Sequence, residues 1–207
     1  MKEYERTSTT VVNAYLLKGM QQYLLSLTAD LESAGMAASI LVVASSGGMM
    51  RIETAIEKPV FAVGSGPAGG VIGCIRLGQL NGHANLIAFD MGGTTAKACL
   101  VEDGKPMHAN EFEIARIFRG KKGSGIPLKI PVIEMIEIGA GGGSIAHLDN
   151  LGLIQVGPKS AGADPGPACY SLGGLGATVT DADLILGYLA ADNFLGGDIQ
   201  LDIEASK

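Results

Sequence analysis

The segment LIAFDMGGTTAKACLVEDGKP, residues 86–106, joins two apolar runs through a polar, glycine-rich loop. The runs Leu86–Phe89 and Ala98–Val101 have the composition of short buried strands, and Glu102-Asp103-Gly104 is a typical turn sequence. Between them, residues 90–95 have the sequence DMGGTT. Glycine N–H groups can close on phosphate oxygens, threonine hydroxyls can donate to them, and an acidic side chain can hold hydrated magnesium. The segment therefore predicts a hairpin whose tip carries a phosphate and metal site. A glycine-rich hairpin closed by an Asx-turn is the purely structural alternative.

Composition limits the class of protein. The 207 residues are 47% hydrophobic and 17% charged, which argues against disorder, and the net charge of −6 argues against a nucleic-acid-binding surface. The three cysteines, Cys74, Cys99 and Cys169, lie far apart without a CxxC motif, so neither a disulfide framework nor a structural zinc site is expected. The N-terminal sequence has no apolar signal region, and no apolar run approaches the roughly 20 residues of a membrane span. We expect a cytoplasmic protein without nucleic-acid or membrane partners.

Hydrophobic periodicity predicts alternating helices and strands, and hence the α/β class. A helix is expected from about Ser8 to Ala34, ended by Gly35. Its apolar stripe consists of Val12, Leu16, Met20, Tyr23, Leu27 and Leu31. A T-x-x-D sequence at Thr180 and Asp183 resembles a capping box for the last helix. The other expected elements are strands at Ile40–Ala44 and Val60–Val63, a helix from GSGPAGG to about Leu80, an element of undecided type at Ile130–Ile138, a hairpin over residues 144–156 and a helix at Thr180–Leu189.

A second glycine motif supports a competing interpretation. Gly64, Gly66 and Gly69 form G-x-G-x-x-G between an expected strand and an expected helix. Asp90 follows about 20 positions later, as in dinucleotide-binding sites where an acid holds a ribose hydroxyl. This spacing predicts a flavin- or nicotinamide-binding module. The short loop after Asp90 disfavours it, because a new strand begins almost at once instead of an ordinary crossover.

Beyond these motifs, DMGGTT resembles the phosphate loops of the actin, sugar-kinase and chaperone ATPase superfamily. A wider set resembles the hydantoinase A and 5-oxoprolinase family, whose relatives include acetone and acetophenone carboxylase subunits. The motifs, from about Glu5 to Ile203, are ERTSTTVVNAYL, SSGG, GSGPAGG, FDMGGTT, IGAGGGSI, VGPKSAGADPGPACY and TVTDADLILG. The resemblance implies an actin-like, ribonuclease-H-type ATPase fold, with ATP and Mg²⁺ as cofactors. It also implies a hydantoin- or 5-oxoproline-type cyclic amide as substrate, whose oxygen ATP would phosphorylate before water attacks.

The resemblance implies roles for residues in three of these motifs. Asp90 would organise magnesium and take part in catalysis, and the phosphate contacts would come from Gly92, Gly93, Thr94 and Thr95. A second loop facing nucleotide or substrate would consist of Gly141, Gly142, Gly143 and Ser144. Asp164 is a candidate catalytic residue near substrate or metal, with a loop-packing role as its alternative. In this scheme GSGPAGG becomes a close-packed turn leading into a helix.

Two departures from the family pattern affect the functional interpretation. The family loop usually has the sequence DMGGTSTD, whereas Lys97 stands here in place of the final acid. An earlier D-x-G-G-T loop is also missing, so we expect the central portion of a longer enzyme whose N-terminal lobe or partner subunit completes the site. In this scheme residues 1–84 join the preceding lobe, and residues 85–207 form an incomplete ATPase lobe. A non-catalytic nucleotide-binding subunit and a carboxylase subunit are the alternatives within the family.

The remaining polar candidates have simpler structural explanations. Asp181 and Asp183 are expected at a helix start rather than in catalysis, and Cys169 is expected to be a small buried thiol. His147 lies on an expected hairpin and is a weaker candidate for a ligand or base. One residue separates Ser45 from a pair of glycines, but the G-x-S-x-G motif of a serine hydrolase is absent from the sequence.

Overall fold

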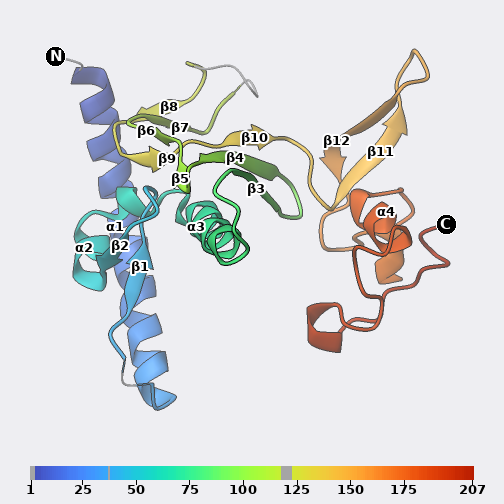
Figure 1. The fold of residues 1–207 in the computed structure, drawn as a ribbon, viewed down its shortest axis with the longest axis horizontal. Coiled ribbons are helices and arrows are strands. Elements are labelled where there is room, and N and C mark those ends of the chain that lie inside the picture. The colour runs from blue at the N-terminus through green and yellow to red at the C-terminus, as the bar shows by residue number, and fades with distance from the viewer. Residues whose placement is uncertain (1–2, 37, 118–122) are drawn as a thin grey trace. The chain divides into compact units, whose positions relative to one another are not determined.

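The computed structural model describes residues 3–36, 38–117 and 123–207 and contains both helices and strands (Figure 1). The chain divides into two compact units. Unit 1 comprises Met1–Phe89 and Ala98–Ile136, and unit 2 comprises Asp90–Lys97 and Glu137–Lys207. The mixed α and β composition confirms the predicted class. The actin-like topology and the division at residue 84 stay predictions.

Unit 1 begins with the long helix α1, Glu3–Ser33. The predicted apolar stripe is half-buried except for Tyr23, which is exposed, while its neighbour Leu24 is buried. The helix ends as predicted, because Gly35 has φ +80° and the N–H of Met36 reaches back to the carbonyl of Leu31 at 2.9 Å. Among the described helices, none combines the length and the apolarity needed to cross a bilayer.

The predicted strand at Val60–Val63 is wrong. This segment forms a short 3-10 helix, η1, Pro59–Ala62, with proline at its start. The N–H of Val60 donates to Asn13 Oδ1 of α1 at 3.2 Å, and the N–H of Phe61 donates to the carbonyl of Lys58 at 3.1 Å. Without a strand before the glycines, GSGPAGG does not have the strand-turn-helix geometry of a dinucleotide-binding motif.

The predicted hairpin after residue 85 is confirmed as β3, Leu86–Met91, and β4, Ala96–Glu102. Helix α3, Ser65–Leu80, begins after Gly64 and packs on the hairpin (Figure 1). Their shared core consists of Ala68, Val71, Ile75, Ala88, Cys99, Val101 and Ile133. Alternate residues Ile87, Phe89 and Leu100 are exposed, as the period of a strand requires.

Short antiparallel pairs complete unit 1. Strand β4 continues through the predicted turn, where Asp103 and Gly104 have positive φ, into β5, Lys105–Pro106. The other elements are β1, Leu41–Val43, paired with β2, Met49–Arg51; α2, Ile52–Glu57; β6, His108–Ala109, paired with β9, Val132–Ile133; and β7, Phe112–Ile114, paired with β8, Ile126–Leu128. The undecided segment 130–138 is extended, because β10, Ile136–Ile138, follows β9.

Unit 2 contains the predicted hairpin of β11, Ser144–Leu148, and β12, Ile154–Ser160. Two short 3-10 helices, η2 (Ala168–Tyr170) and η3 (Leu195–Gly197), flank helix α4, Val179–Ile185, in the chain. The predicted capping box at Thr180 and Asp183 is wrong by two residues, because Thr178 caps the helix and Asp181 completes the box. Cys169, Leu184 and Leu201 form the core of this region.

The packing of α3 on β3 can be tested at two glycines of one helix. A Cβ at Gly78 would collide with the Leu86 side chain and lie 2.9 Å from the carbonyl oxygen of His83, whereas a Cβ at Gly73 would meet nothing within 4 Å. Gly78→Ala should therefore destabilise the protein by about 1–3 kcal/mol. Gly73→Ala should be neutral or stabilising by up to about 1 kcal/mol, because alanine favours a helix. The midpoints of thermal unfolding measure both; equal midpoints for the two variants would contradict this packing.

Candidate functional site

Two glycine loops that are far apart in the sequence contact each other through their backbones. The first loop, Asp90–Thr95, runs from the end of β3 to the start of β4, and the second, Gly139–Ser144, leads into β11 and includes its first residue. The N–H of Gly142 donates to the carbonyl of Gly92 at 2.9 Å, and the N–H of Gly143 donates to the carbonyl of Gly93 at 2.8 Å. Both loops belong to unit 2. The structure therefore brings together the two segments that the sequence singled out separately.

The contact is so close that the second loop needs glycine. A Cβ at Gly141 would lie 2.5 Å from the backbone nitrogen of Thr94 and 2.6 Å from the carbonyl oxygen of Gly92. Both neighbours are backbone atoms, so no side-chain rotation can make room. Gly141 is therefore explained by packing against the first loop.

The second loop uses its backbone donors inside the protein. The N–H of Gly141 donates to Ser144 Oγ and the N–H of Ser144 donates to the carbonyl of Gly141, both at 2.9 Å, while Gly142 and Gly143 donate to the first loop. Ser144 is buried. In this conformation the four residues have no spare N–H for a phosphate. These N–H groups therefore brace the loops, and the predicted nucleotide- or substrate-facing role of the four residues stays a prediction.

The first loop keeps donors that the rest of the protein does not use. The N–H of Gly92 donates to the carbonyl of Thr95 at 3.0 Å, which tightens the loop. For the exposed Gly93 and Thr94, no acceptor of the backbone N–H occurs among the described residues. A Cβ at Gly93 would meet nothing within 4 Å, so open space adjoins this part of the backbone. Two successive N–H groups without a described acceptor, one of them beside open space, suit an anion such as phosphate.

Asp90 lies at the C-terminal end of β3, next to these donors. Its side chain is exposed and makes no hydrogen bond or ion pair within the described part of the chain. In that same part, no group of three or more His, Cys, Asp or Glu side chains is arranged to hold a metal. Magnesium is commonly held by one or two carboxylates together with waters and substrate phosphates. Asp90 fits this mode of binding, not an all-protein cage.

A third segment lies beside the second loop. The N–H of Ala161 donates to the carbonyl of Gly143 at 2.8 Å, and Ser160 Oγ would lie 2.9 Å from a Cβ at Gly143. Asp164 follows in the same loop; its side chain is exposed and has no hydrogen bond or ion pair with described residues. No described hydrogen bond or ion pair of the side chain supports the loop-packing alternative for Asp164, and both this alternative and the catalytic role stay predictions.

Lys97, which replaces the usual acid of the family loop, has an acidic partner. Its Nζ lies 3.8 Å from Glu137 Oε1, and its side chain is only 30% exposed. Both residues belong to unit 2. The lysine charge is therefore directed at least partly to Glu137 and not only to a bound phosphate.

Two weaker candidates lie outside this cluster of loops. His147 is exposed on β11, opposite Gln155 of β12. Ser45 is buried in unit 1, where its hydroxyl is 2.6 Å from the carbonyl oxygen of Phe61 and 2.8 Å from that of Val63. A nucleophilic serine needs a neighbouring base, whereas these contacts are carbonyl oxygens that hold a turn.

Asp181 accepts a network of hydrogen bonds that the sequence did not predict. It is 2% exposed, and it accepts hydrogen bonds from the Thr178 hydroxyl at 2.7 Å, the Thr178 N–H at 2.9 Å and the Cys169 N–H at 2.8 Å. The N–H of Ala168 and the hydroxyl of Ser206 also donate to it. Burial raises the pKa of Asp181, but these hydrogen bonds outweigh burial and lower the pKa overall. Asp181 is a buried structural carboxylate, as expected of a helix-start residue.

Cys169 lies in the same buried cluster. Burial, and secondarily its hydrogen bond to Asp181, raise the pKa of the thiol to about 11. A cysteine acts as a nucleophile through its thiolate, which this environment disfavours. The small buried thiol expected from the sequence agrees with this geometry.

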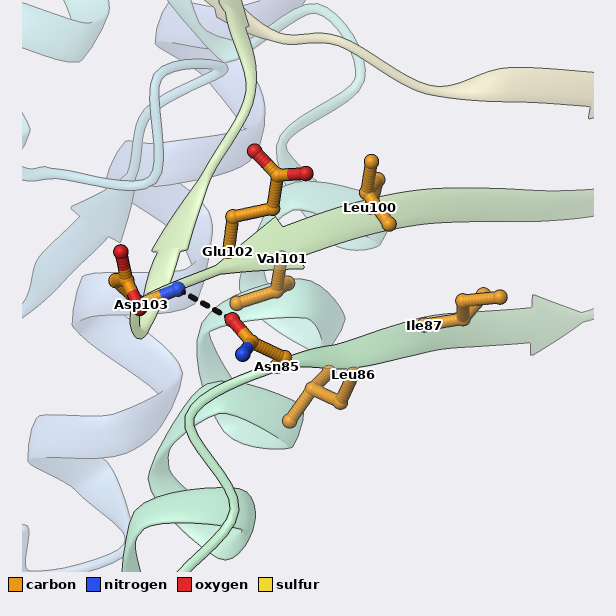
Figure 2. Close-up of a pocket in the computed structure, with 7 residues that line it drawn as sticks. All are labelled: Asn85, Leu86, Ile87, Leu100, Val101, Glu102 and Asp103. Carbon is orange, nitrogen blue, oxygen red and sulfur yellow. Dashed lines mark hydrogen bonds between the residues drawn. The ribbon is translucent and has the colours of Figure 1, made fainter.

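A surface hollow in unit 1 lies away from these loops. An open depression of about 500 Å³ is lined by residues 85–87 and 100–103 of unit 1. Figure 2 shows Asn85 Oδ1 accepting a hydrogen bond from the N–H of Asp103, at 2.8 Å. In the same view Leu100 and Glu102 point to one side of β4, and Val101 points to the other. No residue of the glycine loops lines it, so the hollow is not the candidate site.

Comparison with known proteins identifies the family. The protein-family model described as Hydantoinase/oxoprolinase matches residues 6–207 of this chain. The caprolactamase alpha subunit of Pseudomonas jessenii is 42% identical over 206 residues, which cover 100% of this chain and 28% of that subunit.

Two solved structures are also similar. The crystal structure of ATP-dependent caprolactamase from Pseudomonas jessenii has a TM-score of 0.73 at 42% identity, covering 100% of this chain and 28% of the other. The nucleotide-free structure of acetone carboxylase has a TM-score of 0.74 at 32% identity, with the same coverage of 100% and 28%. This chain spans less than a third of the length of these curated relatives. The chain belongs to the hydantoinase/oxoprolinase family.

Proposed function

We propose that this chain is the part of an ATP-dependent amidohydrolase that binds the nucleotide phosphates. The observation that carries the proposal is the first loop, Asp90–Thr95, where the N–H groups of Gly93 and Thr94 and the carboxylate of Asp90 have no partner among the described residues. Phosphoryl transfer depends mainly on positioning and charge stabilisation, which such a loop supplies. Family membership and the similarity to ATP-dependent caprolactamase support the use of ATP.

Each part of the loop has a distinct task in this proposal. The N–H groups of Gly93 and Thr94 donate to phosphate oxygens, and the hydroxyls of Thr94 and Thr95 add donors. Asp90 orients the waters or phosphate oxygens around magnesium, which when bound neutralises developing negative charge on the phosphates. Gly92 completes the tight turn through its bond to Thr95. The second loop keeps this arrangement fixed.

The reaction we propose is hydrolysis of a cyclic amide of the hydantoin or 5-oxoproline type. The amide oxygen attacks the γ-phosphorus of ATP, and the bond to ADP breaks. Water then adds to the activated ring carbon, and the C–N bond cleaves with a proton transferred to nitrogen, which opens the ring and leaves an acyl phosphate. A second water hydrolyses the acyl phosphate to a carboxylate and phosphate. We place Asp164 near the substrate, because its loop adjoins the second glycine loop and its carboxylate has no hydrogen-bond or ion-pair partner in the described part of the chain.

Further parts of the enzyme complete this chemistry. Because the chain spans less than a third of its relatives, we propose that an N-terminal lobe or a partner subunit supplies the remaining contacts to substrate and nucleotide. The protein would act in the cytoplasm.

Two observations favour a second candidate function. Lys97 replaces an acid of the family loop and is paired with Glu137, and the fold is similar to acetone carboxylase. A carboxylase subunit, or a subunit that binds nucleotide without turnover, would use the same phosphate loop. Dependence of ADP release on bicarbonate would identify the carboxylase, and Mg-ATP binding without hydrolysis would identify the subunit without turnover.

Asp90 provides the direct test of the proposed function. In the full-length polypeptide, Mg-ATP should release ADP only when a cyclic amide such as 5-oxoproline or hydantoin is present. Asp90→Asn should lower kcat at least about 100-fold, because it removes the charge that organises magnesium. Thermal unfolding should change little, since the exposed carboxylate has no described partner. ADP release at the wild-type rate by the variant would exclude the proposed role of Asp90.

Gly93 and Gly141 provide a matched pair that separates ligand contact from bracing. Gly93→Ala adds a methyl group in open space, so it should leave the unfolding midpoint unchanged but weaken Mg-ADP binding by crowding the phosphate. Gly141→Ala should weaken binding and also lower the midpoint, because its methyl group would displace the backbone of the first loop. Isothermal titration calorimetry and thermal unfolding measure the two properties. Wild-type affinity in both variants would refute the site.

A further inference from the structure

The capped end of helix α4 reaches the glycine loops through Thr180. The N–H of Thr180 donates to the carbonyl of Gly142 at 2.8 Å, and the N–H of Gly142 donates to the carbonyl of Gly92 at 2.9 Å. Two consecutive backbone hydrogen bonds therefore connect helix α4 to the second loop and the second loop to the first loop. All of these residues belong to unit 2.

The side chain of Thr180 also limits the space at Gly142. A Cβ at Gly142 would lie 2.8 Å from Thr180 Oγ1, and the next atom, the carbonyl oxygen of Gly92, would be 3.8 Å away. Thr180 is 8% exposed and has little freedom to move aside. The second loop is thus held between the first loop on one side and Thr180 on the other.

Asp181 fixes Thr180 in place from the adjacent position. Its two carboxylate oxygens accept bonds from three separate segments, at residues 168–169, at Thr178 and at Ser206. No described side-chain nitrogen or oxygen that is fully buried lacks a partner, so this cap is completely satisfied. A fully bonded buried network is rigid, because each loss would leave a donor or acceptor unpaired.

We propose that Thr180, anchored by Asp181, is a positioning residue that sets the geometry of the first loop for nucleotide phosphates through the backbone of Gly142. The inference rests on the proposed nucleotide role of that loop. Neither side chain needs to touch the ligand. The effect is transmitted by two consecutive backbone hydrogen bonds, from Thr180 to Gly142 and from Gly142 to Gly92.

A size-compensation experiment tests the proposal in the full-length polypeptide. Gly142→Ala should weaken Mg-ADP binding about tenfold, because the new methyl group pushes against Thr180 and shifts the second loop. Thr180→Ala removes Oγ1 and should change the affinity by no more than about twofold. The double variant should regain the affinity of Thr180→Ala, because the missing Oγ1 leaves room for the methyl group.

Asp181→Asn provides a second test that adds no bulk to the loops. It leaves one acceptor oxygen in place of two, loosens the cap, and should weaken Mg-ADP binding several-fold. Gly78→Ala is the control for loss of stability alone, because it disturbs α3 in unit 1 and should lower the unfolding midpoint without changing the affinity.

Each result is decisive. A wild-type protein that fails to bind Mg-ADP would refute the proposed function itself, and the inference with it. If the wild type binds, unchanged affinity in both Gly142→Ala and Asp181→Asn would overturn the positioning role alone. So would a Gly142→Ala defect that Thr180→Ala does not relieve. Restored affinity in the double variant would support the account, because it would show that pressure between Thr180 and Gly142 reaches the first loop.

Discussion

The candidate site depends on two backbone hydrogen bonds, from Gly142 to Gly92 and from Gly143 to Gly93. Each is worth only about 1 kcal/mol in net stability, but together they hold a loop that is rich in glycine and threonine in one conformation. A flexible loop of this kind would lose conformational entropy when it closes on a ligand. A loop already held by the protein would pay less of that cost. The bracing contact should therefore strengthen ligand binding by the first loop.

Other segments of unit 2 support that contact through further hydrogen bonds. Helix α4 donates from Thr180 to the second loop, and the segment after β12 donates from Ala161 to Gly143. Asp181 ties the start of α4 to η2 and to a residue near the end of the described chain. A buried carboxylate would be unfavourable alone, and its hydrogen bonds compensate for the loss of hydration. The unit is thus organised around polar backbone contacts rather than a large apolar core.

Local sequence patterns predicted the elements that local forces decide. The hairpin around Asp90, the left-handed end of α1 at Gly35 and the hairpin after residue 144 all follow from strand alternation or from glycine positions. The strand prediction for the segment at Val60 was wrong because its apolar side chains suit a strand as well as a 3-10 helix. Pro59 at the first turn and the contact of the Val60 N–H with Asn13, a residue 47 positions away, favour a 3-10 helix instead.

Partners distant in sequence also decide the helix start and the role of the second loop. Two overlapping T-x-x-D patterns compete near residue 180, and the one ending at Asp181 prevails where donors from residues 168, 169 and 206 converge. Family resemblance indicated both glycine loops. It could not show that the amides of Gly142 and Gly143 are occupied inside the protein, because this depends on carbonyls about 50 positions earlier in the chain.

Amide hydrogen exchange in the full-length polypeptide, with and without Mg-ADP, tests the central claim most directly. The amides of Gly142 and Gly143 should be protected already in the free protein, because they donate to Gly92 and Gly93. The amides of Gly93 and Thr94 should exchange rapidly in the free protein and become protected when Mg-ADP binds. Rapid exchange at Gly142 and Gly143 that slows only with nucleotide would show that the second loop, not the first, supplies the phosphate donors. No change at Gly93 and Thr94 in protein that has bound Mg-ADP would equally contradict the account.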